Sequence, residues 1–367
     1  MTYTPRLLIR IRSTILAVIM LSLSFPTYAD SVDKLIRGIM DKRQIPGLQL
    51  AIVKNGEIIK LGNYGLSNLQ DNVPVRSNTV FPINSMTKAF TGVALVQLAE
   101  EGRLSLDDEI GKHLTDLPAN WKSIKIKHLM AHTSGLPNIL SGYLVDLVVR
   151  GNPEATWNKV KELPLKSEIN TQFSYNQTGY VIIGKIIDKY IQGGFPKFIT
   201  YNQLKIANMQ LTADAGFEHM KRPIANHARQ YLYDSDKGQH KNNYVEFPYI
   251  LQTAAGMNST ATEIAQYLIA LQPKKLVKNL NSLWTPITLK NDQTAGFNPV
   301  ENGYAIGWQV IDREHHSAVS ASGGNAATMI HYPDDNLSIV VLTNLIGGLP
   351  IQFVDKIAAE YIPEFKL

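Results

Sequence analysis

The sequence predicts an α+β fold: one antiparallel sheet flanked by helices, with a mostly helical lobe inserted into it. Two apolar stretches near the start, residues 48–54 and 57–64, are separated by Asn55-Gly56, a dipeptide typical of a tight hairpin turn. Helical periodicity then dominates to about residue 211, and strand patterns return after residue 303. We therefore expect both ends of the chain to contribute strands to one sheet.

The chain begins with a segment typical of export. Arg6, Arg10 and Arg12 precede the apolar residues 14–25, and small residues follow up to Ala29. This order predicts a signal peptide over residues 1–29, cleavage after Ala29, and a bacterial periplasmic or secreted location. A membrane anchor would need about 20 apolar residues, so we expect no stable membrane span after cleavage.

Composition narrows the classes of function. The 367 residues, 44% of them hydrophobic, can bury a large core and form two lobes. Loss of the three leader arginines lowers the formal net charge from +5 to +2, so the basic pI predicts no nucleic-acid partner. The absence of cysteine excludes disulfides, thiol nucleophiles and thiolate metal sites.

The elements follow in order along the chain. The first helical pattern is residues 31–43, and the apolar run 81–98 after the hairpin is the next, ended by Gly102. Further helical patterns cover 126–133, 139–149, 179–190, 195–206 and 351–361, and strand patterns cover 304–311, 316–322, 326–332 and 337–343. Residues 212–250 give no clear pattern. We expect a sheet lobe from residues 30–102 and 251–367, and a helical lobe from residues 103–250.

Ser85 and Lys88 are the first candidate catalytic pair. Three residues apart on a helix, they would share a face, so the lysine ammonium could reach the serine hydroxyl. A desolvated lysine can help to activate a serine nucleophile, and a helix N-terminus offers backbone donors to an oxyanion. Taken alone, the stretch favours the simpler interpretation that Ser85 caps a helix.

Two later stretches could supply partners. Tyr175, just before the helical residues 179–190, could take the serine proton if a lysine lowered its pKa, although taken alone it is better explained as a core aromatic. Residues 320–325 place two glycines among the late strands, where backbone amides could approach an oxyanion, and a β-bulge is the alternative.

His128 and His132 stand four residues apart, a spacing that also occurs in metal sites. No glutamate lies between them and no third ligand follows, so we expect packing and hydrogen bonding instead.

The order of these segments resembles the serine β-lactamase and penicillin-binding-protein superfamily, in the branch of class C β-lactamases, D-aminopeptidases, DD-carboxypeptidases and related esterases. The similarity covers roughly residues 31–360. The segments that carry it are Ser85-Met-Thr-Lys88, 100–108, 128–137, 255–263, 304–308 and 333–344.

The resemblance implies a β-lactamase/transpeptidase-like fold and an acyl-enzyme on Ser85, without a metal or organic cofactor. Lys88 and Tyr175 would share the proton transfers. The amides of Ser85 and Gly324 would hold the oxyanion. The remaining residues implied in substrate binding are Gln177, Ser322 and Gly323.

Two positions depart from the family pattern. Gln177 stands where the second motif has asparagine, which changes the reach of the amide. Ala321 stands where the third motif has lysine or histidine, so the cation that would bind a substrate carboxylate is missing.

Two functions remain open from the sequence. The first is an exported serine hydrolase that acts on an ester, an amide or a D-amino-acid peptide. Its substrate would be a small molecule or a peptide, which could come from the cell wall. The alternative is a non-catalytic or weakly active protein that binds cell-wall peptide, which the changes at Gln177 and Ala321 favour.

Overall fold

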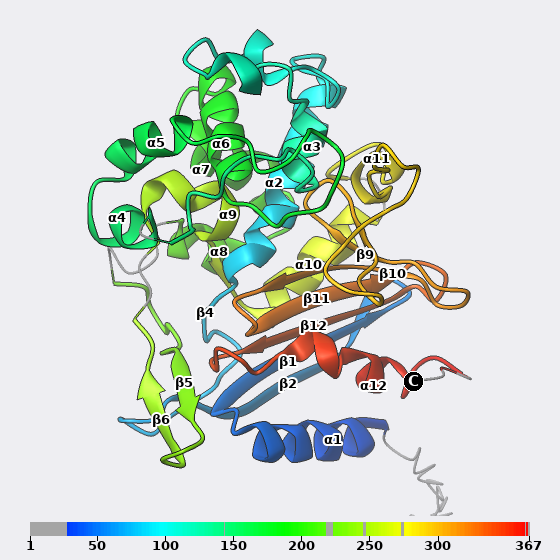
Figure 1. Cartoon of the computed structure of the whole chain (residues 1–367). Coiled ribbons are helices and arrows are strands. Elements are labelled where there is room, and N and C mark those ends of the chain that lie inside the picture. The colour runs from blue at the N-terminus through cyan, green and yellow to red at the C-terminus, as the bar shows by residue number, and fades with distance from the viewer. Residues whose placement is uncertain are drawn as a thin grey trace, which may run out of the picture.

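Eight strands form one antiparallel sheet in the middle of the molecule, in the order β3-β2-β1-β12-β11-β10-β9-β8 (Figure 1). The computed structural model describes residues 28–142, 144–217, 223–244, 247–272, 275–363 and 365. The sheet strands are β1 (Gly47–Lys54), β2 (Glu57–Asn68), β3 (Val73–Pro74), β8 (Gly303–Tyr304), β9 (Gln309–Ile311), β10 (Ala318–Gly323), β11 (Ala327–Tyr332) and β12 (Leu337–Thr343). The N-terminal β1 pairs with the C-terminal β12, which confirms that both chain ends build one sheet.

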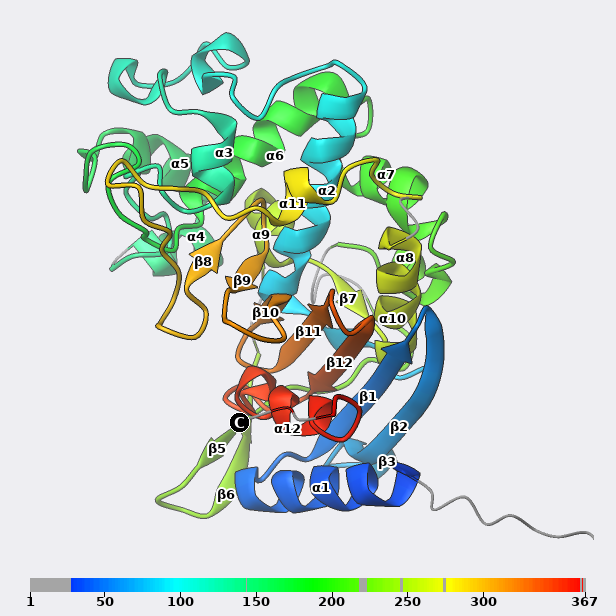
Figure 2. The same cartoon turned by 90° about the vertical axis from the view of Figure 1, so that its right-hand side faces the viewer.

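Helices lie on both faces of this sheet (Figures 1 and 2). They are α1 (Tyr28–Arg43), α2 (Thr87–Glu100), α3 (Ile126–Met130), α4 (Leu144–Arg150), α5 (Pro153–Lys161), α6 (Thr178–Tyr190), α7 (Gly194–Ile199), α8 (Gln210–Ala215), α9 (Gln252–Ala255), α10 (Ala261–Leu271), α11 (Asn281–Trp284) and α12 (Val354–Ala358). Within the part of the chain that the structure describes, no helix is long and apolar enough to cross a membrane. The predicted signal peptide falls almost wholly on residues 1–27, outside the described residues, and stays a prediction.

The alternation of side chains along β1 explains the two layers. Leu50 and Ile52 point to one face, where they join the cluster formed with α1 and α12. Ala51 and Val53 point to the other face and join the cluster that contains α2 and the helical lobe. The predicted turn that ends this strand is present, since Asn55 (φ 54°) and Gly56 (φ 80°) are both left-handed.

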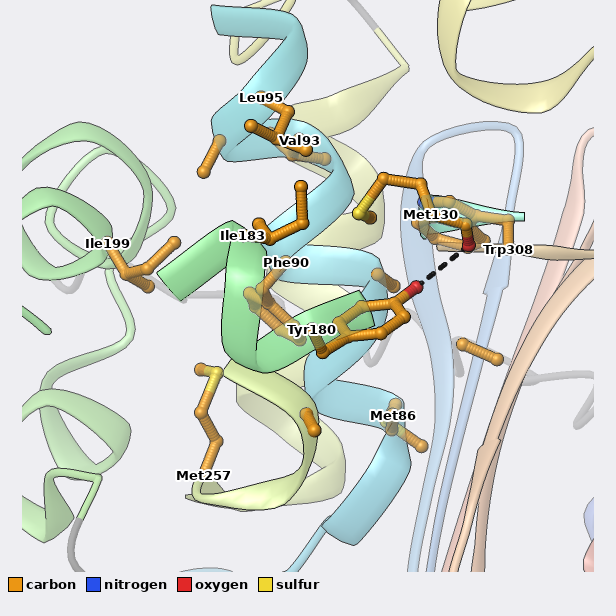
Figure 3. Close-up of a cluster of buried hydrophobic side chains, with 14 of the residues drawn as sticks. Met86, Phe90, Val93, Leu95, Met130, Tyr180, Ile183, Ile199, Met257 and Trp308 are labelled. Carbon is orange, nitrogen blue, oxygen red and sulfur yellow. Dashed lines mark hydrogen bonds between the residues drawn. The ribbon is translucent and has the colours of Figure 1, made fainter. Parts of the chain in front are cut away.

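Helix α2 is the centre of the second layer. Its residues from Thr87 to Leu98 are all buried, as expected of a helix that is apolar on every side. Phe90 and Val93 belong to the same buried cluster as Tyr180 and Ile183 of α6 (Figure 3). The hydroxyl of Tyr180 donates a hydrogen bond to the carbonyl oxygen of Met130 at 3.0 Å, which ties α6 to α3.

Some predicted elements differ from those observed. The stretch 304–311 was expected to be one strand, but β8 and β9 are separated by a turn at Gly307 (φ 83°), whose Cα packs against the carbonyl of Lys88. The helical pattern 126–133 ends at Met130 because His132 is left-handed (φ 59°). The pattern 195–206 is α7 followed by a π-helical turn, Thr200–Leu204.

Residues 212–250, which gave no clear pattern, contain the hairpin of β5 (Tyr231–Asp234) and β6 (Gln239–Asn242). The amide of Tyr231 donates to the carbonyl of Asn344 at 2.8 Å, just beyond β12. This bond attaches the hairpin to the residue that follows β12, and the predicted boundary of the helical lobe at residue 250 stays a prediction (Figure 2). The short strands β4 (Phe81–Pro82) and β7 (Asn258–Ser259) pair with each other. In the chain, β4 precedes α2, and β7 lies between α9 and α10.

The first prediction concerns the contact between α2 and the turn before β9. Glycine-to-alanine changes normally stabilise a helix interior, by about 1 kcal/mol. A Cβ at Gly92, however, would overlap the carbonyl oxygen of Ile306. We expect Gly92→Ala to lower the free energy of unfolding by about 1–3 kcal/mol in urea denaturation, because the backbone must move.

Gly38→Ala is the matched control, since Gly38 lies on the exposed side of α1 with no atom within 4 Å of its Cβ position. This change should leave the protein as stable or more stable. If both variants were stabilised alike, the close contact between α2 and Ile306 would be wrong.

Candidate active site

Ser85 lies on a 3-10 turn, Asn84–Met86, immediately before α2. The turn is held from both sides: the hydroxyl of Thr87 donates to the carbonyl of Asn84 at 2.7 Å and accepts the amide of Met257 at 3.2 Å. The N-cap residue of α2 is Met86, and the Ser85 hydroxyl instead accepts a hydrogen bond from Lys88. The geometry therefore favours the catalytic interpretation of Ser85 over the capping one.

Lys88 is buried, with 1% of its surface exposed. Its Nζ donates to Ser85 Oγ at 3.1 Å and to the carbonyl of Ala254, on α9, at 2.9 Å. The same nitrogen lies 4.9 Å from the ring centres of both Tyr175 and Tyr180. Burial lowers the pKa of Lys88, and the hydroxyl of Tyr175 opposes this shift in part. A lysine in this environment can give up its proton and then accept the proton of Ser85.

Tyr175 is positioned by the residue that follows it. The Asn176 side chain donates to the carbonyl of Leu136 at 2.8 Å and accepts the amide of Gly179 at 3.1 Å, inside the first turn of α6. The Asn176 amide donates to Nδ1 of His132 at 3.1 Å. Three anchors therefore fix the backbone next to Tyr175, which brings its ring beside the Lys88 ammonium.

His132 supports Tyr175 from behind. The centres of the two rings lie 4.3 Å apart, and the centre of the His132 ring lies 4.7 Å from that of Tyr304. Burial, and then the charge of Lys88, lowers the pKa of His132 well below its usual value, so the ring is neutral. Because Nδ1 accepts a hydrogen bond, the proton is on Nε2. His132 therefore packs and accepts a hydrogen bond, as predicted. Its backbone is left-handed, so it lies outside α3 and does not share a helical face with His128.

The end of β10 lies directly against the Ser85 turn. A Cβ at Gly323 would lie 2.7 Å from the amide nitrogen of Ser85 and 2.9 Å from that of Met86, so only glycine fits there. Gly324 is exposed and left-handed (φ 58°), beside the side chain of Asn84. The structure thus brings the peptide of Gly324 next to the Ser85 turn, where an oxyanion would need a second donor.

Ser322 and Ala321 lie on opposite faces of β10. The hydroxyl of Ser322 is 3.0 Å from that of Thr328 on β11, on the face away from Gly323, so its side chain is the predicted site group that the structure does not direct towards Ser85. Ala321 shares the face of Gly323 and is 3% exposed. The family's cation would therefore have pointed towards Ser85 from this position.

Gln177 is the last predicted site residue. Its backbone N–H donates to Oδ1 of Asn138 at 3.2 Å. Its buried side-chain Oε1 has no hydrogen-bond partner among the described residues. Unpartnered buried oxygens are uncommon, which marks this side chain as unusual beside the Tyr175 segment.

An aromatic wall beside Tyr175 was missed by the sequence analysis. The ring centre of Phe297 lies 5.1 Å from that of Tyr175 and 5.3 Å from that of Phe173, and 42% of the surface of Phe297 is exposed. It comes from the long segment between α11 and β8, which has no regular pattern that would have indicated it. The wall makes one side of the site apolar.

The fold and this arrangement of serine, lysine and tyrosine define a class, the serine β-lactamase and penicillin-binding-protein superfamily. The chain belongs to the Beta-lactamase family, whose model matches residues 32–360.

Individual relatives agree with this assignment. The chain is 31% identical over 343 residues to Protein flp of Staphylococcus aureus (strain N315). The aligned part covers 90% of this chain and 66% of Protein flp, so the chain spans just under two thirds of that relative's length. Its fold is similar to the octameric penicillin-binding protein homologue from Pyrococcus abyssi, with a TM-score of 0.74, 22% identity, and 89% and 77% of the two chains covered. It is also similar to EstCE1, a hydrolase with promiscuous acyltransferase activity, with a TM-score of 0.74, 19% identity, and 89% and 97% covered.

The second prediction tests the contact between β10 and the Ser85 turn. Gly323→Ala should displace the amides that face the oxyanion, and the loss of one such donor costs on the order of a hundredfold in rate. We expect this loss in the rate at which a fluorophosphonate labels Ser85. Ser322→Ala, one residue away with its side chain on the opposite face, should label at the parental rate. Equal losses in both variants would show that the face assignment is wrong.

Proposed function

We propose that the chain is an exported serine hydrolase that forms an acyl-enzyme on Ser85. The observation that carries the proposal is the buried Lys88, whose Nζ lies 3.1 Å from Ser85 Oγ and whose pKa burial lowers. Structural lysines are rarely buried, and this one is aimed at a partly exposed serine hydroxyl on a rigid turn. The export of the protein rests on the sequence of residues 1–29.

The arrangement supports a two-step reaction. Neutral Lys88 accepts the proton of Ser85 as Oγ attacks the substrate carbonyl, and the amides of Ser85 and Gly324 stabilise the resulting oxyanion. The tetrahedral intermediate collapses, and Tyr175 or Lys88 returns the proton to the departing alcohol or amine. Water then attacks the acyl-enzyme, and Lys88 or Tyr175 accepts a proton from it. The same group returns this proton to Ser85 Oγ as the bond between Oγ and the acyl carbon breaks and the carboxylic acid is released.

The substrate that fits best is an uncharged ester with an apolar acyl or alcohol group. Ala321 offers no cation to a carboxylate, and Phe297 supplies exposed aromatic surface beside Tyr175. Amides and D-amino-acid peptides use the same chemistry and are the next candidates.

The third prediction tests catalysis against binding alone. The mature protein should be labelled by a fluorophosphonate at Ser85 and should turn over short-chain esters. The labelling rate should rise with pH, because Lys88 must be neutral, with an apparent pKa below the 10.5 of an ordinary lysine. Lys88→Met should lower the labelling rate at least a hundredfold, the usual effect of removing a general base.

Ser85→Ala is the control for this labelling, and mass spectrometry locates the adduct. A folded protein that a fluorophosphonate and a fluorescent penicillin both fail to modify would contradict the hydrolase proposal. It would leave the non-catalytic binding protein as the function.

The fourth prediction concerns the missing cation. Ala321→His should raise kcat/KM for a carboxylate-bearing ester relative to its uncharged analogue by about tenfold, the scale of one charge-assisted hydrogen bond. Comparing the two esters on the same variant corrects for any loss of stability at this buried position. An unchanged ratio would show that position 321 does not face the substrate carboxylate.

A further inference from the structure

A cavity of about 560 Å³ opens between the start of α3 and residues 281–288. We call it the α3 cavity. None of Ser85, Lys88, Tyr175 or Gly324 lines it. Its polar lining includes Asp107, Lys125, Lys127, His128, Asn170 and Thr288. We propose that the α3 cavity is a binding site for a small hydroxylated anion, a carboxylate or a phosphate that carries hydroxyl groups.

Two buried polar atoms in the lining lack partners. His128 is 8% exposed, and its Nδ1 is buried without a hydrogen bond to any described residue. Asn170 Oδ1 is buried and unpartnered in the same sense. Nδ2 of the same side chain donates to the carbonyl of Thr288 at 3.0 Å. Burial without a partner is costly, so both side chains would gain if they turned towards a ligand in the cavity that supplies the missing hydrogen bonds.

The charges around the cavity favour an anion. Lys127 and Lys125 share the single carboxylate of Asp107, with Nζ to Oδ1 distances of 2.7 and 3.2 Å. Nearby Lys290 pairs with Glu168 at 3.4 Å, which leaves an excess of one positive charge among these five groups. Burial, followed by Lys127 and Lys125, lowers the pKa of His128 to about 4, which shows that the ring experiences this positive potential.

The lining also favours hydroxyl groups over a bare ion. Asn170 Oδ1 is an acceptor that needs a donor, which neither a phosphate dianion nor a carboxylate provides. The hydroxyl side chains of Ser282, Thr285 and Thr288 line the same cavity and can both donate and accept. The apolar side chains of Leu106, Ile287 and Ile306 complete the surface, as in most small-molecule sites.

This proposal is independent of the proposed reaction at Ser85. The two sites nevertheless share a segment: Ile306 lines the α3 cavity, and the next residue, Gly307, packs against the carbonyl of Lys88.

Calorimetry of the full chain with four probes tests the site: glucuronate, glycerol phosphate, inorganic phosphate and glucose. Glucuronate or glycerol phosphate should bind about tenfold or more tightly than either inorganic phosphate or glucose, because only the first two combine charge with hydroxyl groups. A preference for glucuronate identifies a carboxylate ligand, and a preference for glycerol phosphate identifies a phosphate ligand. Equal affinity for all four probes, or no binding by either hydroxylated anion, would overturn the proposal.

Variants and the His128 resonance locate the binding. Lys127→Met should weaken binding of the preferred probe about tenfold, whereas Lys237→Met, on the exposed turn of the β5–β6 hairpin, should not. In the parental protein, NMR of labelled histidine should show the pKa of His128 rising when the probe binds, because an anion reverses the local potential. Binding that leaves both measurements unchanged would place the anion elsewhere and contradict the assignment.

Discussion

The buried ammonium of Lys88 is the constraint around which the active site is built. A charge taken out of water needs polar partners, and three different parts of the chain supply them: Ser85 on its own helix turn, the carbonyl of Ala254 on α9, and the phenol of Tyr175 before α6. These partners hold α2, α6 and α9 together. The same burial that makes the charge costly lowers the pKa of Lys88, so the feature that organises the packing also suits Lys88 to its proposed role as base.

Glycines allow the sheet to reach this centre. Gly323 and Gly307 place two backbone segments from the C-terminal part of the chain against the turn of Ser85 and the carbonyl of Lys88, at distances that no side chain would permit. The proposed nucleophile and base, Ser85 and Lys88, lie at the start of one helix, while Gly324, the proposed second oxyanion donor, directly follows β10. Pairing of β1 with β12 joins these distant segments, which makes the geometry of the site depend on the whole sheet.

The sequence predicted the sheet and the closeness of Ser85 and Lys88 because both have local signals. The Asn55-Gly56 turn and the apolar helix before Gly102 depend on neighbours in the chain. The break at Gly307, the left-handed His132 and the attachment of the β5–β6 hairpin depend on tertiary contacts, so periodicity could not show them. Phe297 lies in an irregular segment, and only the fold brings it to Tyr175. Ser322 was grouped with its neighbours by motif, but strand alternation turns its hydroxyl to Thr328.

Electrostatics connect the missing cation to the choice of substrate. In a site that has a lysine or histidine at position 321, that charge would stabilise a substrate carboxylate and a deprotonated tyrosine together. With Ala321, a carboxylate brought beside Ser85 would have to lose its water without gaining a partner there, and Phe297 would add apolar surface instead. An uncharged acyl group avoids this cost and retains the attraction of the aromatic wall. The proton transfers then depend mainly on Lys88, whose pKa is lowered by burial alone and needs no neighbouring cation. In the proposed reaction, the same substitution thus disfavours charged substrates while leaving the activation of Ser85 intact.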